Sequence, residues 1–400
     1  MLWDALTLGL GYNATLVTIG AALLGAAAGV TGSFLFLRKR ALLSDAISHA
    51  TLPGVALAFL AMVALGMDGR ALGGLLAGSA LSAALGLLCV EWLTWRTRIG
   101  EDAAIGAVLS VFFGAGVVLL TVIQTLPTGR QAGLEDFLLG STAGMLRSDA
   151  VLIAWGGALT VVVLIILRRA LSLVAFDPGY AETQGINTRA VDLALMGLVL
   201  AVTVVGLKIV GLILIVALLI IPAVAARFWS EHLPTVVGVA GVIGAGSGYA
   251  GAAMSATAPD LPTGPIIVLI AFAAFTVSIL LAPTRGVLAS LLRRSRYHSR
   301  VHLRQGLLAL ATGQPIYEKL TLRLLQRAGY AHGDGVATQA GAEAAARALL
   351  DESRWTILRE TPELAGARTA YDGLTPIDDV LTVDQIAALD ARLPAPKAVQ

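Results

Sequence analysis

One carboxylate and one imidazole stand four residues apart between two apolar runs, at Asp45 and His49. On a helix this spacing places both side chains on one face, about one turn from each other. A carboxylate oxygen and an imidazole nitrogen in this arrangement can hold one divalent cation. The spacing leaves a second interpretation open, in which Asp45 caps a helix and His49 is a hydrogen-bonded residue near a membrane surface.

The elements that must position this pair are membrane spans. Of 400 residues, 57% are hydrophobic and only 14% are charged, whereas soluble domains carry about 25% charged residues. Nine apolar runs are long enough to cross a bilayer core. The sixth and seventh are separated only by Lys208, so the sequence predicts an all-α polytopic membrane protein with eight or nine transmembrane helices. The runs cover residues 14–37, 51–67, 71–93, 103–126, 150–167, 191–207, 209–226, 235–256 and 264–283.

Basic residues between the runs predict the orientation, because cytoplasmic loops carry an excess of Lys and Arg. They gather on alternate loops, which marks those loops as cytoplasmic. With nine spans, the part of the chain after the last run lies in the cytoplasm. The residues on these loops are Arg38, Lys39, Arg40, Arg96, Arg98, Arg168, Arg169, Arg189, Arg227, Arg285, Arg293 and Arg294.

The stretch around the pair also resembles a known signature. Ser44-Asp45-Ala46-Ile47-Ser48-His49-Ala50, followed by Leu52-Pro53-Gly54, is similar to the Gly-Asp-Ala-Ile-Ser-His-Ala and Leu-Pro-Gly motif of permease subunits of bacterial ABC importers for manganese, zinc or iron (the ABC-3 family). Ser44 stands where that family usually has Gly. The run 206–226 also resembles this family, and the resemblance covers about residues 14–285.

The resemblance implies a bundle like that of type II ABC importers in the bacterial inner membrane. It implies that Asp45 and His49 line the path of Mn²⁺, Zn²⁺ or Fe²⁺, with no permanently bound cofactor. The implied partners are two ABC ATPase subunits, a periplasmic or extracellular metal-binding protein, and a second permease chain, identical or related. One Asp–His pair from each permease would then form a mixed oxygen and nitrogen site.

The loop 176–187 predicts a short helix between two spans, because Pro178 suits a helix start and Gly185 a helix stop. Such a helix is compatible with a plain connector. It also resembles the family loop that forms the coupling helix, which docks in a groove of the ATPase. The resemblance assigns ATPase coupling to Asp177, Pro178, Tyr180, Ala181 and Gly185.

Two segments carry glycines four residues apart, Gly25 with Gly29 and Gly244 with Gly248. Glycines at this spacing let helix backbones approach closely. The pattern is compatible with a seam between two chains or with packing inside one bundle, and the second interpretation is favoured because Gly is common in membrane helices.

The composition changes after Pro283, which predicts a transmembrane permease domain at 1–290 and a small α+β cytoplasmic domain at 291–400. Helices are expected near 301–311, 317–328, 340–358 and 382–393, with a hairpin at 330–338. This part resembles winged-helix repressors of the manganese- and iron-responsive type. Ser353 replaces an expected histidine ligand, and Asp378-Asp379 replaces Glu-His. A degenerate regulatory or docking domain is therefore expected, without nucleic-acid binding.

The sequence contains no Gly-x-x-x-x-Gly-Lys-Ser/Thr phosphate loop and no arrangement of nucleophile, base and acid above chance. We therefore expect no catalytic residues and no enzymatic activity, so that uphill transport depends on a partner or on an ion gradient. Two alternatives to the importer remain at this stage. One is a secondary metal carrier driven by an ion gradient, and the other is a membrane-anchored metal-responsive regulator.

Overall fold

The computed structural model describes residues 11–67, 69, 71–125, 147–258 and 261–393, together with Trp3, Thr7 and Gly9. The chain forms two compact units, Met1–Ala289 and Ser290–Gln400. The first is a bundle of long apolar helices, and the second is a smaller helical unit.

Among the described residues, eight helices are long and apolar enough to cross a membrane. The chain is therefore a mostly helical, polytopic membrane protein. Two shorter helices, α8 (Pro178–Thr183) and α10 (Leu212–Arg227), complete the bundle. The eight long helices are α2 (Tyr12–Leu37), α3 (Ala41–Ala64), α4 (Leu72–Arg96), α5 (Glu101–Thr125), α7 (Arg147–Phe176), α9 (Thr188–Val210), α11 (Leu233–Ser255) and α12 (Thr263–Leu281).

The sixth and seventh apolar runs form a hairpin of helices, because the chain reverses at Gly211. This glycine has φ +80°, a left-handed conformation that side chains rarely adopt. A methyl group placed on Gly206 of α9 would lie only 2.5 Å from Cδ1 of Ile215 in α10. In one continuous helix these residues would be about 13.5 Å apart along the axis. The expected eight or nine spans therefore correspond to eight long helices and one short return helix.

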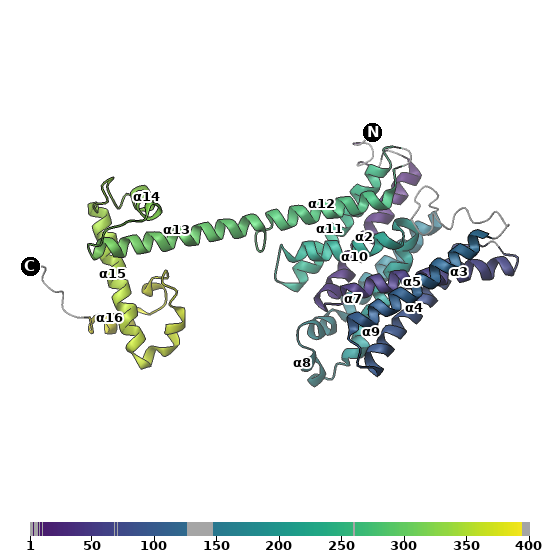
Figure 1. Ribbon diagram of the computed structural model, residues 1–400, viewed down its shortest axis with the longest axis horizontal. Coiled ribbons are helices and arrows are strands. Elements are labelled where there is room, and N and C mark those ends of the chain that lie inside the picture. Colours follow the sequence, from purple (N-terminus) through teal and green to yellow (C-terminus); the bar gives the residue numbers. More distant parts are fainter. Residues whose placement is uncertain are drawn as a thin grey trace, which may run out of the picture. The chain divides into compact units, whose positions relative to one another are not determined.

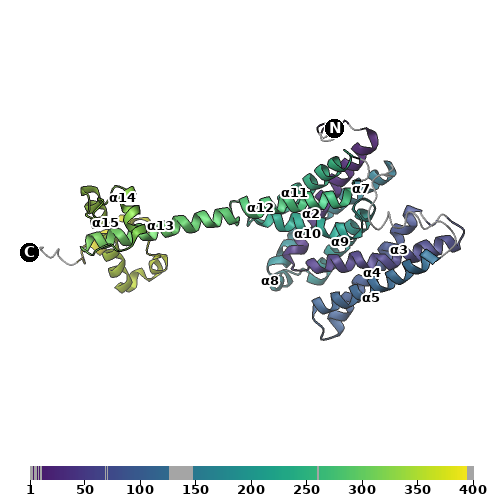
Figure 2. The same ribbon diagram turned by 45° about the horizontal axis from the view of Figure 1, so that its top comes forward.

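Figures 1 and 2 show α3, α4 and α5 side by side on one flank of the bundle, while α2, α10, α11 and α12 pack together on another. Helix α9 lies between these groups and contacts both. The shared core is apolar and includes Leu24 of α2, Ile47 of α3, Val199 of α9 and Leu218 of α10.

The glycine pairs found in the sequence lie on the contact between α2 and α11. A methyl group on Gly25 would lie 2.1 Å from the carbonyl oxygen of Gly244, and one on Gly248 would lie 2.1 Å from that of Ala21. Only glycine permits so close an approach of two backbones. The expectation that these residues pack inside one bundle is confirmed.

One end of the bundle, named here the basic end, carries the last turns of α2, α4, α7, α10 and α12 and the first turns of α3, α5, α9 and α11. Arg38, directly after α2, donates to Asp192 in the second turn of α9 and to the carbonyl oxygen of Val174 in the last turn of α7. Thr284, after α12, donates to the carbonyl oxygen of Phe228, after α10. The positive-inside pattern predicts that this end is cytoplasmic.

Helices are found at the four expected places, as α13 (Val287–Ala311), α14 (Lys319–Arg327), α15 (Gln339–Glu360) and α16 (Val383–Asp390). The first differs in length, because α13 begins 14 residues before the expected 301–311. Two 3₁₀ segments, η1 (Pro362–Ala370) and η2 (Ile377–Asp379), lie between α15 and α16. Trp355 is fully buried and packs in one cluster with Leu358, Ile377 and Leu389.

A polar cluster joins these helices around Glu352. This carboxylate accepts hydrogen bonds from the Tyr371 hydroxyl (2.7 Å) and from Arg304 (3.1 Å). Burial alone would raise the pKa of Glu352, but the bonds from Tyr371 and Arg304 outweigh burial and lower it. The ionised carboxylate is therefore the form that the folded unit favours.

The α+β class expected for this unit is wrong for the described residues, which contain no β-strand. The expected hairpin at 330–338 is a tight reversal with one isolated bridge, Ala331 to Ala337. Gly329 (φ +75°) ends the preceding helical segment and Thr338 already caps α15, so too few residues remain to form two paired strands. A wing requires such strands, and the expected winged-helix fold is accordingly not found.

Candidate metal site and coupling helix

Helix α3 carries Asp45 and His49 on one face, and Nε2 of His49 lies 3.4 Å from Oδ1 of Asp45. The side chains of Leu43, Ile47 and Ala50 are buried in the core, which fixes the rotation of the helix. The carboxylate is consequently 41% exposed and the imidazole 20% exposed. The structure brings the two predicted site residues together, with their polar atoms directed at each other.

The imidazole of His49 is held from the side by α5. The ring of Phe113 meets it edge to face, with centroids 5.0 Å apart and planes at 83°. Within the described part of the chain, its buried Nδ1 has no hydrogen-bond partner. A buried polar atom without a partner is costly and calls for an explanation other than packing.

Pro53 lies inside α3, four residues after His49. Proline has no backbone N–H and cannot donate to the carbonyl oxygen of residue i−4, which here is His49. The main-chain oxygen of the same residue is thus released from the regular helical bonding pattern. Oxygen atoms of this kind, together with carboxylate and imidazole groups, are suitable ligands for first-row divalent metals.

The pair by itself is an incomplete metal site. Over the residues that the structure describes, there is no group of three or more His, Cys, Asp or Glu side chains that could hold a metal ion. Structural Zn²⁺ takes about four ligands and octahedral ions about six. Two side chains from one chain therefore need further ligands from water or from another chain.

The second predicted segment forms α8 with the expected boundaries. Oδ1 of Asp177 accepts a hydrogen bond from the backbone N–H of Tyr180 (2.9 Å), which caps the helix start. Pro178 occupies the first turn, and Gly185, with φ +77°, follows the helix end. Figure 1 shows α8 at one end of the bundle.

Helix α8 has one anchored side and one exposed side. Ala181 is fully buried against Val174 of α7 and Val191 of α9, and its carbonyl oxygen accepts a bond from the N–H of Ile186 (3.0 Å). Tyr180, in contrast, is 52% exposed. The helix is fixed to the bundle at its inner side and presents an aromatic ring at its outer side.

Residues 12–282 match the ABC 3 transport family. The chain belongs to this family. It is 40% identical over 298 residues to the manganese transport system membrane protein MntC of Bacillus subtilis, covering 74% of this chain and 67% of that protein. It is 40% identical over 285 residues to the zinc transport system membrane protein TroC of Treponema pallidum, covering 71% and 94%.

Solved structures agree with this assignment. The chain resembles PsaBC from Streptococcus pneumoniae, solved in complex with a Fab, with a TM-score of 0.61 and 28% identity over 71% of this chain and 98% of that one. An inward-facing putative metal-chelate type ABC transporter shares the fold, with a TM-score of 0.53 and 17% identity. The chain is a multi-pass membrane permease of the ABC 3 transport family.

The structure of this ABC 3 permease contains an ionic cluster at the basic end that sequence reasoning missed. Arg38 forms a two-point ion pair with Asp192, and Arg40, which precedes α3, lies 2.9 Å from Glu101 of α5 and 3.5 Å from Glu91 of α4. All five side chains are at most one third exposed. The only signal in the sequence was that these three acids stand at span ends, near loops rich in arginine.

Proposed function

We propose that this chain is the permease subunit of an ATP-driven ABC importer for a divalent transition metal. The observation that carries the proposal is the Asp45–His49 pair, with 3.4 Å between Oδ1 and Nε2, in a membrane protein of the ABC 3 transport family. Two relatives are named as membrane proteins of a manganese and of a zinc transport system. Mn²⁺ and Zn²⁺ are therefore the proposed cargo, and Fe²⁺ accepts the same oxygen and nitrogen ligands.

A complete ion site forms when two permease chains meet. Two pairs supply two carboxylates and two imidazoles, which is enough for a four-coordinate ion. The surface next to the pair suits such a meeting, because Phe113, Val117 and Val118 of α5 and Leu57 of α3 are 42–63% exposed. The second chain is either an identical copy or a related permease.

The energy for uphill transport comes from a separate ABC ATPase, which docks on α8. The anchored inner side of α8 and its exposed Tyr180 support this role, since a helix must be fixed to the bundle to transmit a movement. An external metal-binding protein delivers the ion at the opposite end of the bundle. In this arrangement the basic end and the unit from Ser290 onward lie in the cytoplasm, and the bundle lies in the inner membrane of a bacterium.

Metal uptake by conservative variants tests the site. Asp45→Asn and His49→Gln keep side-chain size but remove a charge or an imidazole, and each is expected to lower Mn²⁺ or Zn²⁺ uptake at least tenfold. Asp102→Asn and His298→Gln are matched controls outside the pair, since neither residue has a polar contact with Asp45 or His49, and both controls are expected to transport normally. Expression and membrane insertion are measured for all four variants. Normal uptake by both site variants would refute the assignment.

The energy source is tested by a second experiment. Proteoliposomes that contain the permease and its ATPase should transport metal only when ATP is present on the side of the membrane that the basic end faces. Accumulation driven by a proton or sodium gradient without ATP would show a secondary carrier instead.

A further inference from the structure

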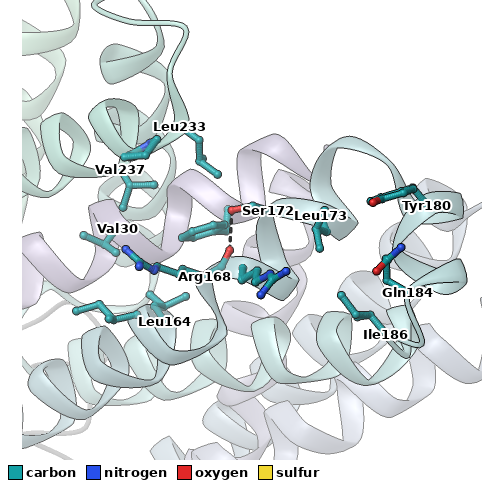
Figure 3. A pocket seen from close by; sticks show the side chains of 14 residues that line it. Val30, Leu164, Arg168, Ser172, Leu173, Tyr180, Gln184, Ile186, Leu233 and Val237 are labelled. Carbon is teal, nitrogen blue, oxygen red and sulfur yellow. Dashed lines mark hydrogen bonds between the residues drawn. The ribbon is translucent and has the colours of Figure 1, made fainter.

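A groove of about 970 Å³ opens at the basic end between α2, α7, α8 and α11 (Figure 3). Its walls are apolar on one side, where α2, α7 and α11 supply Val30, Leu164, Leu233 and Val237. Figure 3 shows Arg168 beside these residues, and Tyr180 of α8 and Gln184, which directly follows α8, across the groove. The groove therefore joins an apolar slot to a polar, cationic rim.

The rim carries positive charge that no acidic side chain among the described residues neutralises. Arg168 and Arg169 both line the groove and are exposed, and in the described part of the chain neither has a carboxylate within 4 Å. Arg38 and Arg285, by contrast, each form an ion pair. The first turn of α11, which also borders the groove, contains no acidic residue and adds the positive end of a helix dipole.

The two arginines also lie at the depth of lipid headgroups. They directly follow the apolar run 150–167 of α7, which is about 27 Å long as a helix and so spans most of a hydrocarbon core of roughly 30 Å. Ile165, one turn earlier, lines the groove and is 58% exposed. An apolar slot in the hydrocarbon layer and two guanidinium groups at its boundary match an acyl chain and a phosphate.

We propose that this groove binds one anionic phospholipid, with an acyl chain against α2, α7 and α11 and the phosphate on Arg168 and Arg169. The groove lies on a different flank from α5 and the Asp45–His49 face, so a second permease meeting at that face leaves it open to the membrane. Ser172, which lines the groove, adds a hydroxyl near the rim, although its own proton is donated to the carbonyl oxygen of Arg168 (2.6 Å).

The lipid would also touch α8, because Tyr180, Gln184 and Ile186 line the same groove. A headgroup between α7 and α8 holds α8 against the bundle. This consequence for ATPase coupling rests on the proposed function, whereas lipid binding itself does not.

Native mass spectrometry of the full-length permease with its ATPase subunits tests the binding. Purified protein is titrated with phosphatidylglycerol and, separately, with phosphatidylcholine. The wild type is expected to bind phosphatidylglycerol at least tenfold more tightly than phosphatidylcholine, and Arg168→Gln/Arg169→Gln is expected to lose this preference. The double variant Arg296→Gln/Arg300→Gln removes the same charge from exposed positions of α13 outside the groove, and is expected to change binding less than twofold.

Three outcomes would overturn the proposal. The first is equal binding of both lipids by the wild type, and the second is an equal loss of binding in both double variants. The third is loss of the ATPase from Arg168→Gln/Arg169→Gln with lipid binding unchanged, which would assign the groove to the ATPase.

Ile165→Gln provides a second test, because this exposed side chain is changed without opening the core. It should weaken binding of phosphatidylglycerol about threefold or more, and unchanged binding would exclude an acyl chain from the slot.

The effect on coupling has its own measurement. Adding phosphatidylglycerol to phosphatidylcholine proteoliposomes should raise metal-stimulated ATP hydrolysis by the wild type and leave the Arg168→Gln/Arg169→Gln variant unchanged. Specific lipid binding without this response would overturn the coupling consequence and leave the lipid site standing.

Discussion

The contact between α2 and α11 predicts that a single methyl group at Gly244 destabilises the bundle. A Cβ atom at this position would lie 2.0 Å from the carbonyl oxygen of Gly25, whereas ordinary van der Waals contact begins at 3.4 Å. The two backbones must therefore separate by about 1.4 Å, the difference between these distances. No flexible side chain can move aside, since the obstructing atom belongs to the backbone of α2.

The size of the effect follows from this separation. Overpacking a well-packed core costs about 1–3 kcal/mol, and a radial gap of 0.5–1 Å already removes about a quarter to a half of a dispersion contact. Separating the helices at Gly244 also opens the neighbouring contacts of Gly248 with Ala21 and of Gly29 with Ala240. We therefore expect Gly244→Ala to cost about 3 kcal/mol of bundle stability, the upper part of that range.

Gly246 provides the matched control on the same helix. It is exposed, and a methyl group there meets nothing within 4 Å. In detergent, Gly244→Ala should lower the melting temperature by several degrees, while Gly246→Ala should leave it unchanged or raise it slightly, because Ala favours helix over Gly. Equal melting temperatures for the two variants would refute the reasoning from backbone contact.

Three further predictions concern the basic end and the second unit. Asp192→Asn leaves Arg38 without its ion-pair partner. The variant should lose about 3 kcal/mol of stability, because the guanidinium charge stays largely buried with no carboxylate to compensate it. Thermal unfolding measures this loss. Asp177→Ala removes the cap of α8, costs about 1 kcal/mol and should speed hydrogen exchange of α8 amides about fivefold. Because the pKa of Glu352 is lowered, the second unit should lose stability as the pH falls below about 4.5, the ordinary value for this group. Hydrogen exchange of α15, followed from pH 6 down to about pH 3 and corrected for the intrinsic pH dependence of exchange, measures that loss, and Glu352→Gln should flatten it.

Each of these has a clear contradicting result. Glu231→Gln is the control for Asp192→Asn, since the Glu231–Arg285 pair is 60% and 49% exposed and such pairs contribute about 0–1 kcal/mol; equal unfolding of both variants contradicts the role of burial. Unchanged exchange in α8 would show that the Asp177 cap is unimportant. A pH profile identical in wild type and Glu352→Gln would assign acid sensitivity to other carboxylates.

The sequence predicted features that depend on near neighbours. The Asp45–His49 contact follows from helical spacing, and the bounds of α8 follow from Pro178 and Gly185. The ionic cluster could not be predicted in this way, because Arg38 and Asp192 are 154 residues apart and no local periodicity relates them. The groove beside Arg168 likewise requires four helices in their final arrangement.

Two errors in the second unit and one ambiguity in the bundle have local causes. The chain does reverse within the hairpin expected at 330–338, but a turn pattern in the sequence does not reveal how many residues remain to pair on each side of the turn. His302, for which the sequence gives no sign of burial, lies 3.1 Å from Glu318 and is 17% exposed, because α14 packs against it. The reversal at Gly211 was ambiguous because the apolar composition is the same on both sides of it.

The ion pair between Arg38 and Asp192 joins the end of α2 to the second turn of α9. α9 begins only five residues after α8 ends, and α3 begins three residues after Arg38, so a movement of α8 would be transmitted through α9 and this ion pair to the first turns of α3, which carry Asp45 and His49. If the ATPase moves α8, the coupling of that movement to transport depends on one guanidinium–carboxylate ion pair. Weakening this ion pair would allow ATP hydrolysis without transport of the ion.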